Sequence, residues 1–468
     1  MCGIAGAYGV PNASYLVALM LKAMQHRGQE AAGIVSSDGK ELHEHKALGL
    51  VDEVFRDFDK DDEKDDYATR LPGTVAIGHI RYATTGDPKN HRNIQPLVAR
   101  RKRGAKAIVH NGNLTNYAEM RAKLENQGAI FRSTSDTELF LHLMARSNAS
   151  TAASRLVDAC NSVEGAYALL TLTVDTLVAA VDPLGFRPLA YAPYKGGTLF
   201  ASETCAFDLF GIPAAEWKCL ELDQMIEFTA NGHDFMNGPG QGFSRHCSFE
   251  HIYFTRPDSK IFGTFAGAVR KKLGILLALE SPAVADVVIA APDSSNTMAA
   301  AYAQTLGIPF EFGLVRNHYT GRTFLTPTQI ARELGVRMKL NADRSVVEGK
   351  RVVVIDDSIV RGTTATKMVE LLRSAGATEV HIRIASPPVE HPCFWGIDTP
   401  NREELIAARK SVDELNQKIR GDSLAFLAIQ SLRTALDDVA GERYCTTCFT
   451  SILPDDRLIP ASSLFAKR

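Results

Sequence analysis

The sequence predicts two domains of different architecture, an α+β domain followed by an α/β domain, and three observations support this. The first half holds many short β-type runs separated by glycine. In the second half, apolar strands alternate with helical patterns, which is typical of a parallel sheet with crossover helices. Between them lies the glycine- and proline-rich segment 237–242, which is typical of a linker. The chain has 468 residues, enough for two or three domains of roughly 150 residues each. We therefore place the domains at 2–236 and 247–468.

In the first domain, β-type runs predict strands at 74–80, 107–110, 166–173, 177–181 and 225–228. Helical patterns fall at 14–25, 116–127 and 135–145. The last of these follows three residues of the helix-capping type, at 133–135, and carries three leucines. The acidic stretch 57–66 is predicted to be a solvated loop, and the basic run 100–104 a hairpin tip.

In the second domain, three apolar runs predict buried strands at 286–290, 351–355 and 379–384. Helical patterns follow the first two, at 297–305 and 364–375. Strand, loop and helix repeat in this order, so we expect a parallel sheet.

Composition excludes several classes of protein. The 52 basic and 54 acidic residues give a net charge of -2, which argues against a broadly cationic protein that binds nucleic acid or membrane surfaces. No apolar run approaches the roughly 18–20 residues that span a bilayer. The N-terminus lacks the basic region and long apolar core of a secretory signal. We therefore expect a cytoplasmic protein with no membrane or nucleic-acid partner.

The segment 352–364 is the strongest local signal for a binding site. Asp356 and Asp357 end a buried strand, where open α/β sheets bind ligands. The loop that follows ends in Gly362, Thr363 and Thr364, just before a helix whose first N–H groups suit a phosphate. The carboxylates suit sugar hydroxyls or magnesium. A phosphorylated sugar fits this chemistry, while an ordinary turn with an aspartate cap is the alternative.

Two further loops are candidates beside it. Ser294 follows another strand end and could reach a metal-bound pyrophosphate, although a simple turn would explain this loop equally well. The basic and aromatic segment 316–324, which contains Arg322, could cover a polyanionic leaving group. Taken singly, such charges are usually solvated surface.

Cys2 is a candidate nucleophile. Removal of Met1 is expected because the next side chain is small, and it would leave a thiol beside a free α-amino group. The two groups form a nucleophile and base within one residue. An incidental cysteine is the alternative.

Four segments around this cysteine, 2–6, 25–33, 78–86 and 110–113, together resemble the class II glutamine amidotransferases. The resemblance implies an N-terminal-nucleophile fold, a glutaminase sandwich of two sheets between helices. It implies that Cys2 attacks the glutamine amide, that Asn111 and Gly112 form the oxyanion hole, and that Arg81 and Asp136 hold the α-carboxylate and α-amino groups. Arg27 and His79 would support the site.

The segment 352–364 resembles the phosphoribosyl pyrophosphate loop of type I phosphoribosyltransferases, and the whole chain resembles the glutamine phosphoribosylpyrophosphate amidotransferases. This implies the first step of purine synthesis: glutamine, water and phosphoribosyl pyrophosphate give 5-phosphoribosylamine, glutamate and pyrophosphate. Asp356 and Asp357 would serve ribose and Mg²⁺, Ser294 the Mg²⁺, and residues 362–364 the 5-phosphate. An internal ammonia path, feedback by purine nucleotides and a homotetramer are also implied.

Eight cysteines in a long chain do not suggest a disulfide scaffold. Cys160, Cys205 and Cys219 lie in apolar contexts and are predicted core residues. Cys445 and Cys448 form a Cys-x-x-Cys pair, which alone fits a redox pair, zinc, an iron–sulfur cluster or coincidence.

With Cys247 and Cys393, this pair resembles the ligands of the iron–sulfur branch of the family. The resemblance implies a structural [4Fe–4S] cluster, with zinc as the alternative. Members of that branch often carry a propeptide, whereas only Met1 precedes Cys2 here.

Two other functions remain open from the sequence. A non-catalytic nucleotide sensor on the same folds is disfavoured because the chain holds the full set of candidate catalytic residues. A glutamine amidotransferase with another ammonia acceptor is disfavoured by the phosphoribosyl-type loop.

Overall fold

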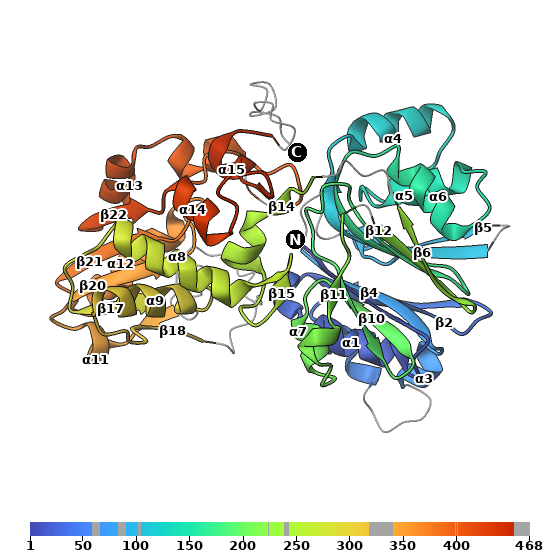
Figure 1. Ribbon diagram of the computed structural model, residues 1–468, viewed down its shortest axis with the longest axis horizontal. Helices are drawn as coiled ribbons and strands as arrows, with labels where there is room; N and C mark the ends of the chain where they lie inside the picture. Colours follow the sequence, from blue (N-terminus) through green and yellow to red (C-terminus); the bar gives the residue numbers. More distant parts are fainter. Residues whose placement is uncertain are drawn as a thin grey trace.

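The computed structural model describes residues 1–58, 66–82, 90–101, 104–222, 224–237, 243–317, 340–397, 399 and 401–453. Figure 1 shows two lobes, one built from the first half of the chain (blue to green) and one from the second (yellow to red). The N-terminus lies between them, so the first residues of the chain are at the junction.

The first half contains two antiparallel sheets. The seven-stranded sheet has the order β11-β9-β10-β1-β4-β2-β3, and the six-stranded sheet has the order β13-β12-β8-β7-β6-β5. The strands of the first sheet are β1 (Gly3–Tyr8), β2 (Ala31–Ser37), β3 (Leu42–Leu48), β4 (Val75–Arg81), β9 (Ala190–Tyr194), β10 (Gly197–Ala201) and β11 (Lys218–Cys219). Those of the second are β5 (Leu97–Arg101), β6 (Gly104–Leu114), β7 (Gly165–Leu172), β8 (Leu177–Val181), β12 (Gln224–Thr229) and β13 (Gly232–Asn237).

Helices cover the outer face of each sheet, which gives four layers (Figure 1). Successive side chains of a strand point to opposite faces, so each strand contributes side chains to two hydrophobic cores, one on each face of its sheet. In β4, Ile77 packs between the two sheets, and Ile80 packs against the helices outside. The first sheet is covered by α1 (Ala13–Ala23), α2 (Val51–Val54), α3 (Tyr67–Arg70) and α7 (Cys205–Asp208). The second is covered by α4 (Tyr117–Asn126), α5 (Glu138–Arg146) and α6 (Ala152–Cys160).

The second half is built on a parallel sheet of order β17-β20-β21-β22. Its strands are β17 (Val287–Ala290), β20 (Arg351–Asp356), β21 (Glu379–Ile384) and β22 (Ser423–Phe426). One face packs against α8 (Ala266–Glu280), α9 (Asn296–Leu306) and α14 (Ile429–Ala435). The other packs against α11 (Arg344–Val347), α12 (Thr363–Ser374) and α13 (Val412–Ile419). Residues 352–355 of β20 are all apolar because both faces of the strand are covered.

Short elements complete the second half. A π-helix, η5 (Glu250–Phe254), follows the linker segment, and α15 (Thr447–Thr450) lies near the last described residues. Three two-stranded ladders pair β14 (His246–Cys247) with β23 (Tyr444–Cys445), β15 (Lys260–Ile261) with β16 (Thr264–Phe265), and β18 (Leu314–Arg316) with β19 (Leu340–Ala342). The β14–β23 ladder is parallel and joins the two ends of the second half.

The predicted elements are confirmed, with shifted ends. The third predicted helix begins at Glu138 rather than 135, because Asp136 accepts a backbone N–H from Leu114 and holds the chain before the helix starts. The predicted hairpin at 100–104 is the turn between β5 and β6, with Arg101 paired to Gly104. Most of the acidic stretch 57–66 lies outside the described residues. The elements that the sequence analysis did not predict include β1, β2, β3, α6 and α8.

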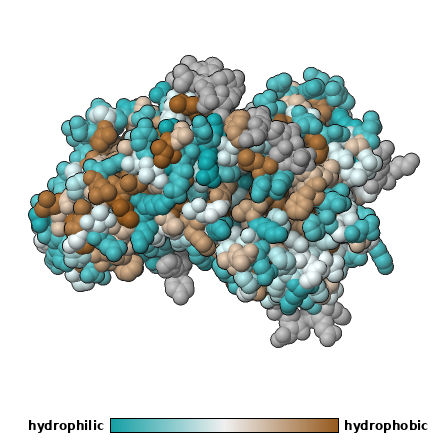
Figure 2. All heavy atoms as spheres, in the orientation of Figure 1, coloured by the Kyte–Doolittle hydropathy of each residue, from teal (hydrophilic) through white to brown (hydrophobic). Residues whose placement is uncertain are grey.

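Hydrophobic and hydrophilic side chains are mixed on the face drawn in Figure 2. Several large apolar side chains of the second half are exposed, among them Leu279, Val284, Phe312 and Val439. Within the described residues, no helix combines the length and the hydropathy needed to cross a bilayer.

Candidate functional site

Cys2 lies immediately before β1, which pairs with β4 on one side and β10 on the other. Its backbone N–H donates to Asn111 Oδ1 at 3.2 Å, and its thiol contacts the carbonyl oxygen of Tyr82 at 3.6 Å. Burial raises the pKa of the Cys2 thiol, because a thiolate loses its hydration inside the protein. A base beside the thiol would therefore be needed to form the nucleophile.

Asn111 and Gly112 lie on β6, beside Cys2. The Asn111 side chain is fully buried, and its Nδ2 has no hydrogen-bond partner within the described residues. A buried N–H without a partner costs free energy, so its presence beside a thiol indicates a donor kept for a ligand. Gly112 has no room for a side chain, because a Cβ there would lie 1.9 Å from the carbonyl oxygen of Ala166.

Arg81 and Asp136 provide opposite charges near the same end of the sheets. Arg81 ends β4 and is 4% exposed. Asp136 Oδ2 accepts the backbone N–H of Leu114 at 2.9 Å, and its Oδ1 lies 3.7 Å from His110 Nδ1. Burial would raise the pKa of Asp136, but His110 and these hydrogen bonds lower it. The carboxylate is therefore charged and suits an ammonium group.

The two predicted supporting residues differ in what they do. Arg27 is fully buried, and its Nε donates to the carbonyl oxygen of Cys2 at 3.0 Å. His79 is also fully buried, and burial lowers its pKa to about 3. It is therefore a neutral side chain at ordinary pH, whereas Arg27 carries its charge directly beside Cys2.

Asp356 and Asp357 end β20 at the carboxyl edge of the parallel sheet. Asp357 Oδ1 accepts from Ser358 Oγ at 2.6 Å, and Asp356 Oδ1 accepts the backbone N–H of Asp357 at 2.9 Å. Burial raises the pKa of both carboxyls, and Asp357 raises that of Asp356 further. Two adjacent buried carboxylates would be stabilised by a cation or by hydroxyl donors.

The phosphate-type loop stands directly after these carboxylates. Gly362 has φ 76° and precedes α12, whose first residues are Thr363 and Thr364. Gly362, at the N-cap, has no side chain to cap this helix, so the N–H groups of the first turn suit an anion. A left-handed φ favours glycine at this position.

Ser294 lies in the loop after β17, next to the same carboxylates. Its Oγ donates to Asp357 Oδ2 at 2.5 Å, so the two loops meet at one point. Asp293, in the same loop, forms an ion pair with Arg316 at 3.1 Å. Arg322 lies outside the described residues.

The four cysteines from distant segments gather at one small cavity. Cys247 pairs with Cys445 across the β14–β23 ladder, and Cys393 and Cys448 line the same cavity. Burial raises the pKa of the Cys247 thiol to about 12 and that of Cys445 to about 11. Of the three cysteines predicted to be core residues, Cys160 and Cys205 are buried and Cys219 is half-buried.

The spacing of these thiols bears on which metal group they fit. A tetrahedral zinc, with Zn–S of about 2.3 Å, would place its sulfurs about 3.8 Å apart. In the described residues, a single group of three potential ligands (His, Cys, Asp or Glu) has its ligand atoms within 4.8 Å of one another. This group is Asp38, Glu41 and His43, and it contains no cysteine. No three of the four thiols are that close, which suits a larger cluster better than one zinc ion.

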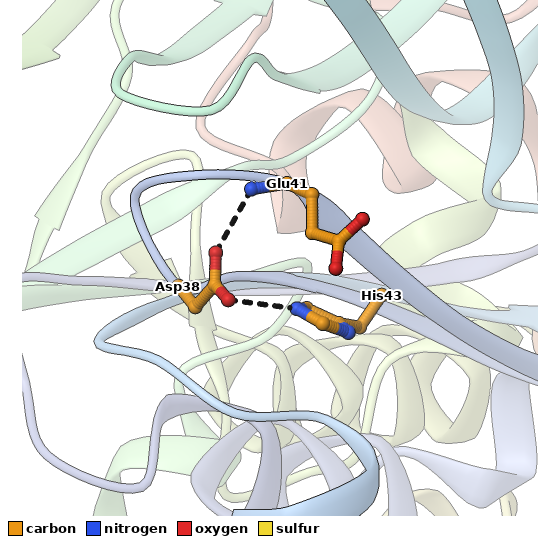
Figure 3. A group of neighbouring side chains, drawn as sticks. All are labelled: Asp38, Glu41 and His43. Carbon is orange, nitrogen blue, oxygen red and sulfur yellow. Dashed lines mark hydrogen bonds and ion pairs between the residues drawn. The ribbon is translucent and has the colours of Figure 1, made fainter.

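The group Asp38, Glu41 and His43 is a turn rather than a metal site (Figure 3). Asp38 Oδ1 accepts the backbone N–H groups of Lys40 and Glu41, and Oδ2 contacts His43 Nε2 at 3.1 Å. These bonds occupy the carboxylate and close the hairpin between β2 and β3.

Contacts between the halves involve residues that the sequence analysis missed. Asn113 Nδ2 donates to the carbonyl oxygen of Phe394 at 2.8 Å. Arg187 Nε donates to that of Trp395 at 3.1 Å, and Trp395 stacks on Phe186. Nothing in the local sequence around Arg187 indicates this contact.

Comparison with known proteins agrees with both halves. Residues 79–208 match a glutamine amidotransferase domain, and residues 268–386 match a phosphoribosyl transferase domain. The chain is 47% identical over 466 residues to the chloroplastic amidophosphoribosyltransferase of Vigna aconitifolia, covering 99% of this chain and 93% of that one. It is 45% identical to the amidophosphoribosyltransferase of Bacillus subtilis, covering 97% and 94%. The chain belongs to the amidophosphoribosyltransferase family.

A solved amidophosphoribosyltransferase structure has the same fold across both halves. It is the glutamine phosphoribosylpyrophosphate amidotransferase of B. subtilis complexed with ADP and GMP, with a TM-score of 0.89, 44% identity and 97% of each chain covered. Within the amidophosphoribosyltransferase fold, the Cys2 site and the Asp356–Asp357 site therefore belong to one enzyme.

Proposed function

We propose that this enzyme transfers ammonia from glutamine to phosphoribosyl pyrophosphate. The products are 5-phosphoribosylamine, pyrophosphate and glutamate, and one water is consumed, as in the first step of purine synthesis. The observation that carries the proposal is the buried, unpartnered Nδ2 of Asn111 beside Cys2, in a chain that also places paired carboxylates before a phosphate-type loop. Family membership agrees with both halves of this reaction.

In the first half-reaction, the Cys2 sulfur attacks the side-chain amide carbon of glutamine. Once Met1 is removed, the α-amine of Cys2 takes the thiol proton and passes it to the leaving nitrogen, which departs as ammonia. The tetrahedral oxyanion accepts hydrogen bonds from Asn111 Nδ2 and from the backbone N–H of Gly112. Water then hydrolyses the thioester and releases glutamate.

The charges around Cys2 orient the substrate. The Arg81 guanidinium pairs with the α-carboxylate of glutamine, and the charged Asp136 carboxylate accepts from its α-ammonium. This arrangement selects an amino-acid zwitterion whose side-chain amide points at the thiol. Arg27 fixes the carbonyl of Cys2 at the other side of the nucleophile.

In the second half-reaction, ammonia attacks C1 of the ribose and displaces pyrophosphate. Asp356 and Asp357 accept from the ribose hydroxyls, and the N–H groups and hydroxyls of Thr363 and Thr364 bind the 5-phosphate, with Gly362 shaping the turn. Ammonium is not nucleophilic, so a dry internal path between the sites would keep ammonia neutral. Arg322, from the sequence, remains a candidate for the pyrophosphate.

Magnesium fits the residues at this site. The hydroxyl of Ser294 donates to Asp357, the carboxyl of Asp356 is the next along the chain, and oxygen ligands are those that Mg²⁺ prefers. Both carboxyls have raised pKa values, so a bound cation would relieve the cost of their charge. When bound, Mg²⁺ would neutralise the charge that develops on the leaving pyrophosphate.

A [4Fe–4S] cluster fits the four cysteines. The four cysteines line one cavity, and no three of their sulfur atoms lie within 4.8 Å of one another, whereas a single tetrahedral zinc would need sulfurs about 3.8 Å apart. The cluster would have a structural role because the reaction transfers no electrons. Metal analysis of protein purified without oxygen tests this, with about four iron atoms and four sulfides per chain expected. Stoichiometric zinc instead of iron would contradict it.

Nucleotide regulation and subunit assembly are part of the same proposal. The B. subtilis enzyme was solved with ADP and GMP, and we propose that purine nucleotides inhibit this enzyme as well. The exposed apolar side chains Leu279, Val284, Phe312 and Val439 could be covered in a homotetramer. The cytoplasm stays a prediction from the sequence.

The test of the function is pyrophosphate release from phosphoribosyl pyrophosphate, with Mg²⁺ and either glutamine or ammonium. Wild type should use both nitrogen sources, and Cys2→Ala should use ammonium alone. If metal-replete, folded protein releases pyrophosphate with neither source, the enzyme is not acting on this acceptor, and a nucleotide sensor becomes the better hypothesis.

A further inference from the structure

Arg27 makes contacts in two directions that link the nucleophile to the second half of the chain. Its Nε donates to the carbonyl oxygen of Cys2 at 3.0 Å. Its two terminal nitrogens face Glu250, with Nη2 2.8 Å from Oε1 and Nη1 3.0 Å from Oε2. Nη1 also contacts Glu203 Oε1 at 2.6 Å. The guanidinium is therefore fixed on every edge.

Glu250 is the one bidentate partner of Arg27 in the described part of the chain, and it comes from the second half. It is the first residue of η5, three residues after Cys247, and it is fully buried. Thr255 Oγ1 also donates to its carboxylate, at 3.0 Å. Burial would raise the pKa of Glu250, but the charge and hydrogen bonds of Arg27 lower it, so the carboxylate is ionised. Fork-to-fork pairing of this kind fixes the plane of the guanidinium.

Arg187 continues the network toward the cysteine cavity. Its Nη1 lies 3.5 Å from Glu250 Oε1, and its Nε donates to the carbonyl oxygen of Trp395 at 3.1 Å. Two buried arginines and two buried glutamates, Arg27, Arg187, Glu203 and Glu250, thus balance one another in charge. Removal of any one leaves an uncompensated buried charge.

We propose that Glu250 is a positioning residue for Cys2, supplied by the second half and acting through Arg27. The inference rests on the proposed function of Cys2 as the glutaminase nucleophile. Glu203 contacts one terminal nitrogen of Arg27, so without Glu250 the guanidinium could rotate about that contact. The bidentate bond to Glu250 sets the plane of the group, and that plane aims the Nε–H at the Cys2 carbonyl. The glutaminase site is therefore complete only when the second half is in place.

Glu250→Gln in the full-length, metal-replete enzyme tests this. The glutamine-dependent kcat is expected to fall about 10–100-fold, the range that a small misplacement of a reacting group can cost. The KM for glutamine should stay within about twofold, because Arg81 and Asp136 are untouched. The ammonium-dependent rate should be unchanged, since Cys2 takes no part in it. Glu250→Asp keeps the charge but shortens the reach and should show a smaller fall in the same kcat.

Glu280→Gln is the matched control, since this glutamate of the second half is exposed and contacts Ala428 far from Arg27. It should leave all rates unchanged. A folded Glu250→Gln enzyme with wild-type glutamine kcat would overturn the proposal. So would an equal fall with both nitrogen sources, which would indicate a purely structural role.

If Glu250→Gln does not fold, Glu250→Asp is judged by the same criterion, and failure of both to fold also counts against positioning. Cys2→Ala distinguishes a failure of the proposed glutaminase function from a failure of the positioning role of Glu250. If this variant still uses glutamine, the proposed function fails. If it does not, but Glu250→Gln is normal, only the positioning role fails.

Discussion

The backbone of Gly396 packs directly against that of Gly112. A Cβ on Gly396 would lie 2.9 Å from the carbonyl carbon of Gly112. Gly112 follows Asn111 on β6, and Gly396 follows Cys393 by three residues. The segment that holds a cavity cysteine therefore also supports the strand that carries the proposed oxyanion donors. The hydrogen bond from Asn113 to Phe394 strengthens the same contact.

Gly396→Ala should impair glutamine use selectively. Gly396 has φ 103°, and the new methyl would press on Gly112, so β6 must shift. We expect a fall of about tenfold or more in glutamine-dependent kcat with little change in the ammonium-dependent rate. Gly307→Ala is the control, because Gly307 also has a positive φ but open space around its Cβ. Equal effects of the two variants would attribute the loss to backbone strain alone.

Asn111→Asp should remove the oxyanion donor while keeping the shape of the side chain. Its Oδ1 can still accept from Cys2, but the N–H donor at Nδ2 is lost. Glutamine-dependent kcat is expected to fall about 10²–10³-fold. Steady-state rates with both nitrogen sources measure this, and Asn116→Asp, at the start of α4, serves as the comparison. An Asn111→Asp enzyme that hydrolyses glutamine normally would exclude this role.

Asp356→Asn should lower activity and raise stability. The pKa of Asp356 is raised by burial and by Asp357, so its charged form costs free energy in the folded state. A raised folded pKa means that stability falls as pH rises above the ordinary carboxyl pKa, and the amide removes this cost. The Tm of the ligand-free variant at neutral pH should exceed that of wild type, while rates with glutamine and ammonium both fall about 10–100-fold. A lower Tm would contradict this reading.

Glu138→Gln should destabilise the segment that holds Asp136. The Glu138 carboxylate accepts from the backbone of Arg132 and from the backbone and hydroxyl of Ser133. Burial alone would raise its pKa, but His142, Ser133 and Arg132 lower it to about 2. A lowered folded pKa gives stability that is present above the ordinary carboxyl pKa and lost as pH falls toward 2.

The loss in Glu138→Gln should be on the order of 1–2 kcal/mol near neutral pH. Urea unfolding at several pH values would measure it. The difference from wild type should shrink as the pH is lowered from about 4.5 to 2. A difference that is constant over that range would show that the charge of Glu138 does not matter.

The sequence predicted the parts of the site that depend on local pattern. Asp356, Asp357 and Gly362 follow from one strand–loop–helix segment, and the structure brings them to one edge of the sheet. Cys2 and Asn111 are 109 residues apart and were paired only by resemblance, which the hydrogen bond between them supports. Helix α8 was missed because the spacing of its apolar residues was not recognised as that of an amphipathic helix.

The contacts between the halves could not have been predicted in this way. Arg27 and Glu250 are 223 residues apart, and the local sequence around either residue does not indicate the other as its partner. A buried ion pair between domains depends on how the two folded domains pack together. That packing cannot be inferred from a single sequence. The same applies to Gly396, whose need for glycine depends on the backbone of β6.

The β14–β23 ladder also sets an order of events during synthesis. Cys247 and Cys445 are partners in that ladder, yet one is translated about 200 residues before the other. At roughly 5–20 residues per second, the ribosome adds Cys445 some 10–40 s after Cys247. Throughout that interval the first half can fold, but the cysteine cavity lacks Cys445 and Cys448. The nascent chain therefore exposes the thiols of Cys247 and Cys393 to oxidation until the segment with Cys445 and Cys448 emerges.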